Sequence, residues 1–261
     1  MITIVFGIPG VGKTCYLTAE AVKYLNNSTD CLDLLLKTEL QVNELRCTGL
    51  NLSLPKHAPV YTNYDLRVDV GREKICSYYI DGFHLGFDNP DVDIMPVYPG
   101  SKIFLSEAQR YYNSRNRQLP DWVSRFYEEH RHFGLDIFLD CQRPDLIDAN
   151  IREIAGEFIE MLKTEVIAGQ TIFHYRRYTS WSELEKCREG LRILPEIETK
   201  VIPFVVFDYF KSCCYFNEFV PKMDFWQFGH ILGNTPSEIE LGKTMYRQIA
   251  PPGFYKETKR K

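Results

Sequence analysis

A glycine-rich segment near the N-terminus has the residue types and spacing of a phosphate-binding loop. Residues 7–14 read Gly-Ile-Pro-Gly-Val-Gly-Lys-Thr and match the pattern G-x-x-x-x-G-K-[ST] without a gap. Glycines let successive backbone N–H groups point at phosphate oxygens, and a following helix adds the positive end of its dipole. Lys13 is expected to reach the β- and γ-phosphates of ATP, and the Thr14 hydroxyl to ligate Mg²⁺. The predicted nucleotide-binding residues are Gly7, Pro9, Gly10, Val11, Gly12, Lys13, Thr14 and Cys15.

Hydrolysis requires further groups, and the clearest candidates follow the apolar run of residues 102–105. In P-loop NTPases a strand commonly ends in an Asp that holds the water shell of Mg²⁺, and a following Glu orients the attacking water. Here these positions hold Ser106 and Glu107. Ser106 can hydrogen-bond a metal-bound water but brings no charge, so Ser106→Asp is expected to raise hydrolysis or tighten its Mg²⁺ dependence. If another carboxylate, such as Asp81, already supplies the charge, the same change would help little or would weaken binding through like-charge repulsion. Glu107 is the predicted catalytic residue, with a helix-capping role as the alternative.

Two more polar residues follow other predicted strands. Gln142 comes after the apolar run of residues 135–139, and its amide can bond both phosphate and water. We therefore predict that Gln142 senses the γ-phosphate, with a surface glutamine as the alternative. Asp81 follows the apolar residues 78–80 and is a rival carboxylate for the metal, although a turn aspartate before Gly82 is the more ordinary interpretation.

Arginines and tyrosines cluster just after Glu107. Arg110, Arg115 and Arg117 are interleaved with tyrosine and asparagine residues. Such a segment can contact DNA through phosphate charge and ring stacking, or supply an arginine finger to a neighbouring subunit. It can equally be a solvated loop, and the sequence leaves the three interpretations open.

The elements that must position these groups alternate along the first 162 residues. Apolar or β-branched runs predict strands in five segments: 1–6, 60–63, 75–80, 102–105 and 135–139. Helical spacing of apolar residues is found in four segments: 14–25, 30–45, 120–133 and 145–162. This alternation predicts an α/β fold of the P-loop NTPase type, with a mostly parallel sheet and helices on both faces.

Beyond residue 162 the pattern changes. Residues 164–167 and 171–178 predict a β-hairpin, and the sequence Ser-Trp-Ser-Glu at 180–183 predicts a capped short helix. Residues 191–261 are rich in aromatic residues and prolines and end in a basic tail. We therefore predict two domains: a P-loop ATPase domain over residues 1–180 and a β-rich C-terminal appendage over residues 181–261.

The composition excludes several classes of protein. The chain has 261 residues, of which 44% are hydrophobic and 25% charged, which excludes a disordered chain, a collagen-like repeat and a coiled-coil rod. Its net charge of −4 means that any contact with nucleic acid must come from a local patch. The eight cysteines form no Cys-x-x-Cys pair and no signal peptide is recognised, so we expect reduced thiols in a cytoplasmic protein. No run approaches the ~18 apolar residues that a membrane helix needs.

Several segments together resemble the zonula occludens toxin family, which includes the assembly ATPases of filamentous phages. They follow the family's order over about residues 1–212, and the block from His130 to Gln142 is the most family-specific. The segments are residues 7–14, 60–64, 106–109, 130–137 with Gln142, and 209–212. The resemblance implies an ATP-driven role in phage assembly and export at the host inner membrane. It also implies a homo-oligomer, such as a ring, with phage assembly proteins, single-stranded DNA and that membrane as partners.

Two features depart from the family pattern. The family has Asp-Glu-Ala-Gln where this chain has Ser-Glu-Ala-Gln at 106–109, which leaves the efficiency of hydrolysis open. Many members also carry a transmembrane helix after the ATPase domain, and none is predicted here, so we expect a protein of the cytoplasm or of the cytoplasmic face of the membrane. Two other functions stay open: a nucleotide or small-molecule kinase, and an ATP-gated, catalytically slow assembly scaffold. The Ser-Glu-Ala-Gln segment favours water over a kinase substrate as the acceptor.

Overall fold

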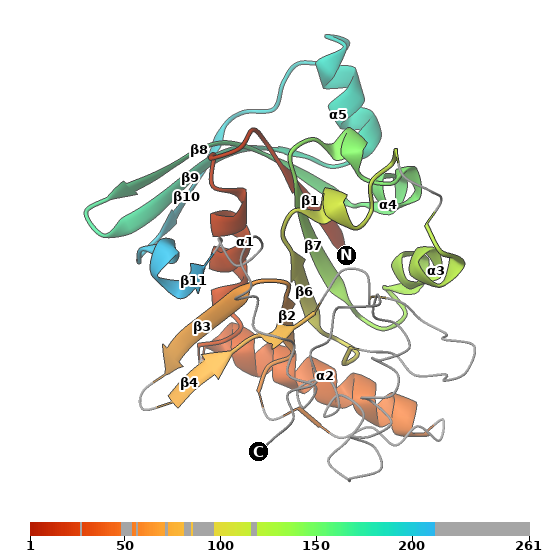
Figure 1. Ribbon diagram of the computed structural model, residues 1–261, viewed down its shortest axis with the longest axis vertical. Coiled ribbons are helices and arrows are strands. Elements are labelled where there is room, and N and C mark those ends of the chain that lie inside the picture. Colours follow the sequence, from red (N-terminus) through yellow and green to blue (C-terminus); the bar gives the residue numbers. More distant parts are fainter. Residues whose placement is uncertain are drawn as a thin grey trace, which may run out of the picture.

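An eight-stranded sheet forms the centre of the protein (Figure 1). The computed structural model describes residues 1–26, 28–47, 54–55, 57–70, 73–80, 85, 97–115 and 119–211. The strand order is β10-β9-β8-β1-β7-β6-β2-β5. Strands from β8 to β5 pair in parallel with their neighbours, whereas β9 pairs antiparallel with both β8 and β10. The strands are β1 (Ile2–Phe6), β2 (Val60–Thr62), β5 (Tyr78–Tyr79), β6 (Lys102–Leu105), β7 (Asp136–Cys141), β8 (Glu157–Ile167), β9 (Gln170–Tyr178) and β10 (Glu198–Ile202).

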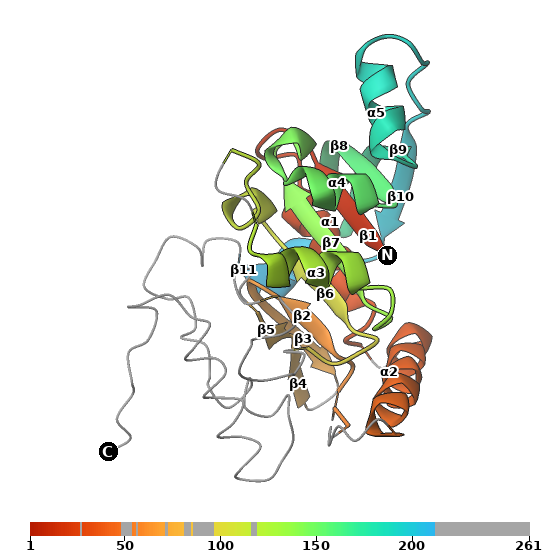
Figure 2. The same ribbon diagram turned by 90° about the vertical axis from the view of Figure 1, so that its right-hand side faces the viewer.

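Helices cover both faces of this sheet. Figures 1 and 2 show α1 on one side of the central strands and α3 and α4 on the other. The helices are α1 (Lys13–Val22), α2 (Thr29–Cys47), α3 (Asp121–Glu129), α4 (Ala149–Ile154) and α5 (Trp181–Arg188). A second, three-stranded sheet is formed by β3 (Asp65–Val70), β4 (Glu73–Cys76) and β11 (Phe210–Lys211).

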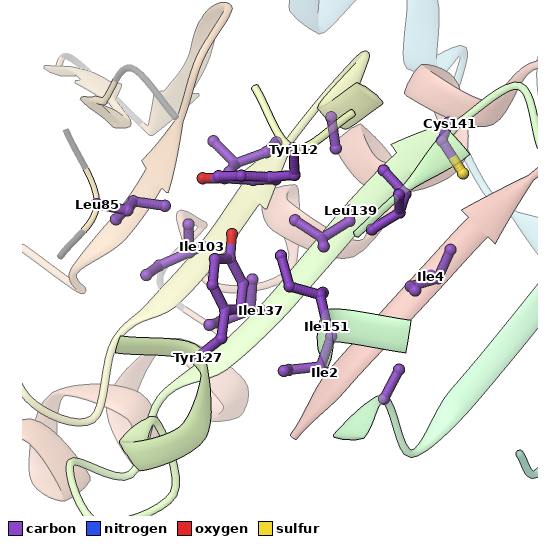
Figure 3. Packing of buried hydrophobic residues seen from close by; sticks show 14 of the residues in the cluster. Ile2, Ile4, Leu85, Ile103, Tyr112, Tyr127, Ile137, Leu139, Cys141 and Ile151 are labelled. Carbon is purple, nitrogen blue, oxygen red and sulfur yellow. The ribbon is translucent and has the colours of Figure 1, made fainter. Parts of the chain in front are cut away.

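Side chains along β1 point alternately to the two faces of the sheet, and apolar residues on both faces must be buried by helices. Ile2 and Ile4 belong to the apolar cluster that includes residues of α3, α4 and α5, whereas Val5 belongs to the cluster beneath α1. Figure 3 shows part of the first cluster, in which Ile137 of β7 gathers with Tyr127 of α3 and with α4. A strand that is buried on both faces has a continuous apolar run rather than an alternating one. The predicted α/β class, with a mostly parallel sheet and helices on both faces, is confirmed.

Three of the predicted helices are too long, and the helix predicted over 14–25 ends at Val22. The helix predicted over 145–162 is wrong outside residues 149–154, because α4 spans only Ala149–Ile154 and β8 begins at Glu157. Phe158 and Ile159 lie in apolar clusters on opposite faces of the sheet, as successive residues of a strand do. Both residues pair with β1, although the spacing of the apolar residues also suited a helix. The helix predicted over 120–133 ends at Glu129, five residues before the left-handed turn residue Gly134 with φ 63°.

The predicted hairpin and capped helix are present after residue 156. β8 and β9 form the hairpin around Ala168 and Gly169. At α5, Ser180 Oγ accepts a hydrogen bond from the Glu183 N–H at 3.1 Å, and the Glu183 carboxylate accepts one from the Thr179 N–H at 2.7 Å. This arrangement satisfies N–H groups at the start of the helix.

Residues 181–211 of the predicted C-terminal appendage pack against the main sheet. β10 extends this sheet beside β9, and β11 pairs with β3 of the smaller sheet. Residues 212–261, including the basic tail, lie outside the described residues. The domain boundary at residue 180 therefore stays a prediction.

The described residues can be compared with the expectations for cysteines, metal sites and membrane-spanning helices. Its buried free thiols are Cys15, Cys31, Cys141 and Cys187. Within that region, no group of three or more His, Cys, Asp or Glu side chains is arranged to hold a metal ion. Of the helices it contains, none has the length and apolar character to cross a membrane.

Candidate nucleotide site

The glycine-rich loop joins β1 to α1 at the carboxyl end of the parallel strands. Gly7, Gly10 and Gly12 have φ values of 152°, 84° and 92°, which side-chain-bearing residues rarely adopt. A Cβ on Gly12 would lie 2.1 Å from Oγ1 of Thr164, so β8 packs directly against the loop. At Gly10 a Cβ would meet no atom of the described residues within 4 Å. The loop is therefore held from behind by β8 and open at its tip.

Two hydrogen bonds fix the shape of the loop. The Thr164 hydroxyl donates to the Val11 carbonyl oxygen at 2.7 Å, and the Lys13 ammonium donates to the Ile8 carbonyl oxygen at 3.2 Å. The Lys13 side chain is thus folded across the loop and is only 6% exposed. The next buried residue, Cys15, has its pKa raised to about 12 by burial, so its thiol stays neutral. Cys15 can contribute to anion binding through its backbone N–H, but not as a thiolate.

A cluster of hydroxyl and carboxylate oxygens lies beside the first turn of α1. Asp140, near the end of β7, accepts hydrogen bonds at Oδ2 from the Thr14 hydroxyl at 3.0 Å and from the Ser106 hydroxyl at 2.8 Å. Its Oδ1 accepts the backbone N–H of Glu107 at 2.8 Å. The Thr14 and Ser106 hydroxyl oxygens are themselves 2.9 Å apart. The structure therefore brings the predicted metal-side residues Thr14 and Ser106 together and adds a carboxylate between them.

Asn63 holds the end of β6 in place for this cluster. Its side-chain oxygen accepts the Ser106 N–H at 2.8 Å, and its amide donates to the Ser106 carbonyl oxygen at 2.8 Å. Asn63 follows β2, the neighbour of β6 in the sheet, and is 3% exposed. The double hydrogen bond fixes the backbone at the position from which Ser106 reaches Asp140.

The Asp140 carboxyl group is completely buried, with 0% exposure. Its pKa is raised, chiefly by burial. The Glu107 N–H, the Ser106 hydroxyl and the positive charge of Lys13 act in the opposite direction and offset this only in part. A buried carboxylate is costly unless it is hydrogen-bonded and balanced by positive charge. The hydrogen bonds are present, so the cluster is suited to the approach of a cation.

Glu107 occupies a strained turn at the end of β6. Its φ of 55° lies in the left-handed region, which costs a non-glycine residue about 1–3 kcal/mol. The short 3₁₀ helix η2 (Ala108–Arg110) follows, and the Glu107 side chain makes no capping hydrogen bond to it. Its carboxylate instead accepts a hydrogen bond from the Gln109 amide. Strain that places a half-buried carboxylate beside the cluster is consistent with a functional position.

The other predicted site residues are only partly described. Gln142 directly follows β7 and is exposed, and the pairing of Phe6 with Cys141 places it at the same sheet edge as the loop. Arg110 and Arg115 are exposed on the segment after Glu107. Arg117 and Asp81 lie outside the described residues, so the structure places neither.

Comparison with known proteins assigns the family. The family model described as Zonular occludens toxin (Zot) matches residues 1–215. This chain belongs to the Zot family. The predicted resemblance is thereby confirmed over more than the first 212 residues.

Solved structures similar to this Zot-family chain share little sequence with it. The N-terminal domain of zonular occludens toxin from Neisseria meningitidis is 17% identical, with a TM-score of 0.47, over 80% of this chain and 98% of that one. The genome packaging NTPase B204 from Sulfolobus turreted icosahedral virus 2, in complex with ATP-gammaS, is 12% identical, with a TM-score of 0.38, over 78% of this chain and 97% of that one. A search of curated proteins gives no match.

Sequence reasoning missed the carboxylate at the centre of this Zot-family site. Asp140 follows the apolar residues 137–139 within β7. The sequence-based prediction assigned the functional role to Gln142, the residue just beyond the strand, and assigned none to Asp140. The sequence does contain a signal for Asp140, because a charged residue near the end of a buried parallel strand is unusual. Asn63 and Thr164 were missed as well, since their contacts join segments far apart in the chain.

Proposed function

We propose that this Zot-family protein binds ATP with Mg²⁺ in the glycine-rich loop and hydrolyses it to drive the assembly and export of a filamentous phage. The observation that carries the proposal is the juxtaposition of the loop with the oxygen cluster. The Thr14 hydroxyl, in the first turn of α1, faces the buried Asp140 carboxylate at 3.0 Å, while the loop tip at Gly10 is open. Family membership supports the role in phage assembly.

The residues present fit a magnesium ion. Mg²⁺ prefers oxygen ligands and is usually held by one or two carboxylates together with water and substrate phosphates, so a cage of acidic side chains is not required. Thr14, Ser106 and Asp140 offer two hydroxyl oxygens and a carboxylate within hydrogen-bonding distance of one another. When bound, Mg²⁺ neutralises charge on the transferred phosphoryl group.

The other residues of the site then have distinct roles. The N–H groups of the loop and the Lys13 ammonium hold phosphate oxygens, since both are donors at the positive end of α1. Glu107 orients the attacking water and accepts its proton. Gln142, at the same edge of the sheet, donates to the γ-phosphate.

The arginines after Glu107 and the partners of the protein belong to the same proposal. Arg110, Arg115 and Arg117 serve either as an arginine finger toward a neighbouring subunit of a homo-oligomeric ring or as a contact to single-stranded DNA. The ring acts with phage assembly proteins at the cytoplasmic face of the host inner membrane.

An ATP-gated scaffold is the second candidate function. It is favoured by Ser106, which stands where the family pattern has an aspartate, because a serine brings no charge to the metal side. The two functions share the binding site and differ in turnover. A kinase would share the loop as well, but no observation on the described residues favours it.

Nucleotide titration and turnover test the proposal. Lys13→Ala is expected to weaken the binding of a fluorescent ATP analogue at least tenfold, because a charged hydrogen bond to phosphate contributes about 1.5–3 kcal/mol. Lys186→Ala, at an exposed position on α5, is the matched control and should bind like the wild type. Wild-type affinity in Lys13→Ala would refute the site. Turnover at a fixed oligomeric state, with and without single-stranded DNA, then separates the ATPase from the scaffold.

A further inference from the structure

We infer that the negative charge on the metal side of the site is supplied by Asp140 of β7, and that Ser106 of β6 positions this carboxylate instead of replacing it. The inference rests on the proposed function of the loop and deepens it. It changes the meaning of the serine: the chain has not lost a metal-side carboxylate but carries it on the neighbouring strand.

The register of the sheet makes the two positions equivalent. β6 and β7 are parallel neighbours with Leu105 opposite Leu139, so Ser106 and Asp140 stand side by side one residue further on. Two residues earlier, on the same face of the sheet, the rings of Phe104 and Phe138 are stacked, with centroids 4.6 Å apart. Since adjacent strands are about 4.8 Å apart, a carboxylate on either strand reaches the same small volume next to α1.

The hydrogen bond from Thr14 has the direction that metal ligation requires. A hydroxyl that ligates a cation turns a lone pair toward the metal and must donate its proton elsewhere. Thr14 donates to Asp140 Oδ2 at 3.0 Å, which leaves its lone pairs available on the side away from the carboxylate. Ser106 donates to the same oxygen at 2.8 Å, so both hydroxyls orient one carboxylate oxygen.

The charge of Asp140 has no evident structural purpose. Its three hydrogen bonds come from neutral donors, namely two hydroxyls and one backbone N–H. An asparagine could keep all three contacts, because its oxygen can accept the N–H and the hydroxyls can rotate to accept from its amide. A buried charge that hydrogen bonding does not require and that costs stability is typical of a functional site.

Calorimetric titration with ATP-gammaS, with Mg²⁺ and with EDTA, tests the inference without relying on turnover. Asp140→Asn is expected to lose the tightening of affinity by Mg²⁺ tenfold or more while its affinity in EDTA stays within threefold of the wild type. The exchange variant Ser106→Asp/Asp140→Ser should recover most of the Mg²⁺ effect. Asp136→Asn, the same change at the other end of β7, is the matched control and should keep the full effect. If Asp140→Asn keeps the Mg²⁺ effect and Ser106→Ala loses it, the inference is overturned.

A second variant keeps the inference testable if Asp140→Asn does not fold. Ser106→Asp places two carboxylates side by side, so its melting temperature without ligand should fall and then rise with Mg²⁺ more than that of the wild type. The stronger response to Mg²⁺ agrees with the sequence-based expectation for Ser106→Asp, whereas the loss of stability without ligand is specific to this inference. Tighter Mg²⁺ binding with no loss of stability in the absence of ligand would contradict the inference. If the wild type binds no ATP-gammaS under either condition, the proposed function itself fails.

Discussion

The two ends of β7 carry aspartates only four residues apart with opposite surroundings. At the amino end, Asp136 is surrounded by positive charge: it pairs with Lys102, with the N-terminal amino group at 2.8 Å, and with Lys37 at 3.6 Å. At the carboxyl end, Asp140 is hydrogen-bonded by neutral groups alone. Burial raises the pKa of Asp140, whereas for Asp136 the pKa is lowered to about 2, because its cationic partners outweigh partial burial. The Asp136 carboxylate is thus paired with cations of the fold, whereas the direct hydrogen-bond partners of Asp140 are all neutral.

This difference follows the polarity of a parallel sheet. The carboxyl ends of the strands meet the N-terminus of α1 and the open loop, where ligands of α/β proteins bind. The amino ends meet the opposite edge, where Leu135 and Asp136 close the strand against the start of β1. Under the proposed function, a charge at the amino-end edge contributes to stability, and a charge at the loop edge contributes to ligand binding.

The largest expected effect comes from Glu107, which follows β6 at the loop edge of the sheet. Glu107→Gln should reduce ATP turnover by about 10²- to 10⁴-fold, because an amide cannot accept the proton of the attacking water. Nucleotide affinity and melting temperature should stay near those of the wild type, since the backbone N–H that bonds Asp140 is retained. Steady-state hydrolysis and thermal denaturation measure both. Glu185→Gln, an exposed control on α5, should hydrolyse ATP normally; equal turnover in the two variants would remove Glu107 from the mechanism.

A smaller effect, on stability, is expected from Asp136 at the amino end of β7. Asp136→Asn should lower the free energy of unfolding by about 1–2 kcal/mol at neutral pH and leave nucleotide affinity unchanged. Because the folded-state pKa is lowered, this contribution is present above the ordinary pKa of ~4 and is lost as the pH falls toward about 2. Urea denaturation at several pH values should therefore show the gap between variant and wild type closing in acid. A constant gap would mean that packing, not charge, accounts for the loss.

The smallest effect tests a residue that lies at the loop edge but acts on structure. Thr164→Val removes the hydroxyl that donates to the Val11 carbonyl oxygen at 2.7 Å and keeps the side-chain volume. We expect a loss of about 1 kcal/mol in the free energy of unfolding and a few-fold weaker nucleotide binding. Thr199→Val on β10 is a control away from the loop. If Thr164→Val weakens binding as much as Lys13→Ala, the loop depends on β8 more than this description allows.

The sequence predicted those parts of the fold whose signals are local. The loop, strands β1 and β7 and the capped helix α5 depend on neighbouring residues, and they are present as predicted. The segment of Ile154, Phe158 and Ile159 was misjudged, because a helix and a two-face-buried strand both bring apolar residues to such positions. What decided between them was pairing with β1, which no local pattern records.

The site was predictable only as far as its motif reaches. Thr14 and Ser106 were both expected near the metal, and the structure brings them within 2.9 Å of each other. Asp140 was not expected, because its role depends on β7 lying between β1 and β6. Strand order is a property of the whole sheet, so the carboxylate becomes recognisable only once the strands are assembled.

Thermal denaturation with and without Mg²⁺ and ATP-gammaS tests the contrast between the two aspartates most directly. In Asp136→Asn the melting temperature without ligand should fall, and the rise on adding Mg²⁺ and nucleotide together should equal that of the wild type. In Asp140→Asn the melting temperature without ligand should be maintained or higher, and the extra rise due to Mg²⁺ should be lost. The reverse pattern, a destabilised Asp140→Asn that still gains the full Mg²⁺-dependent rise, would show that Asp140 is a structural residue and contradict the account.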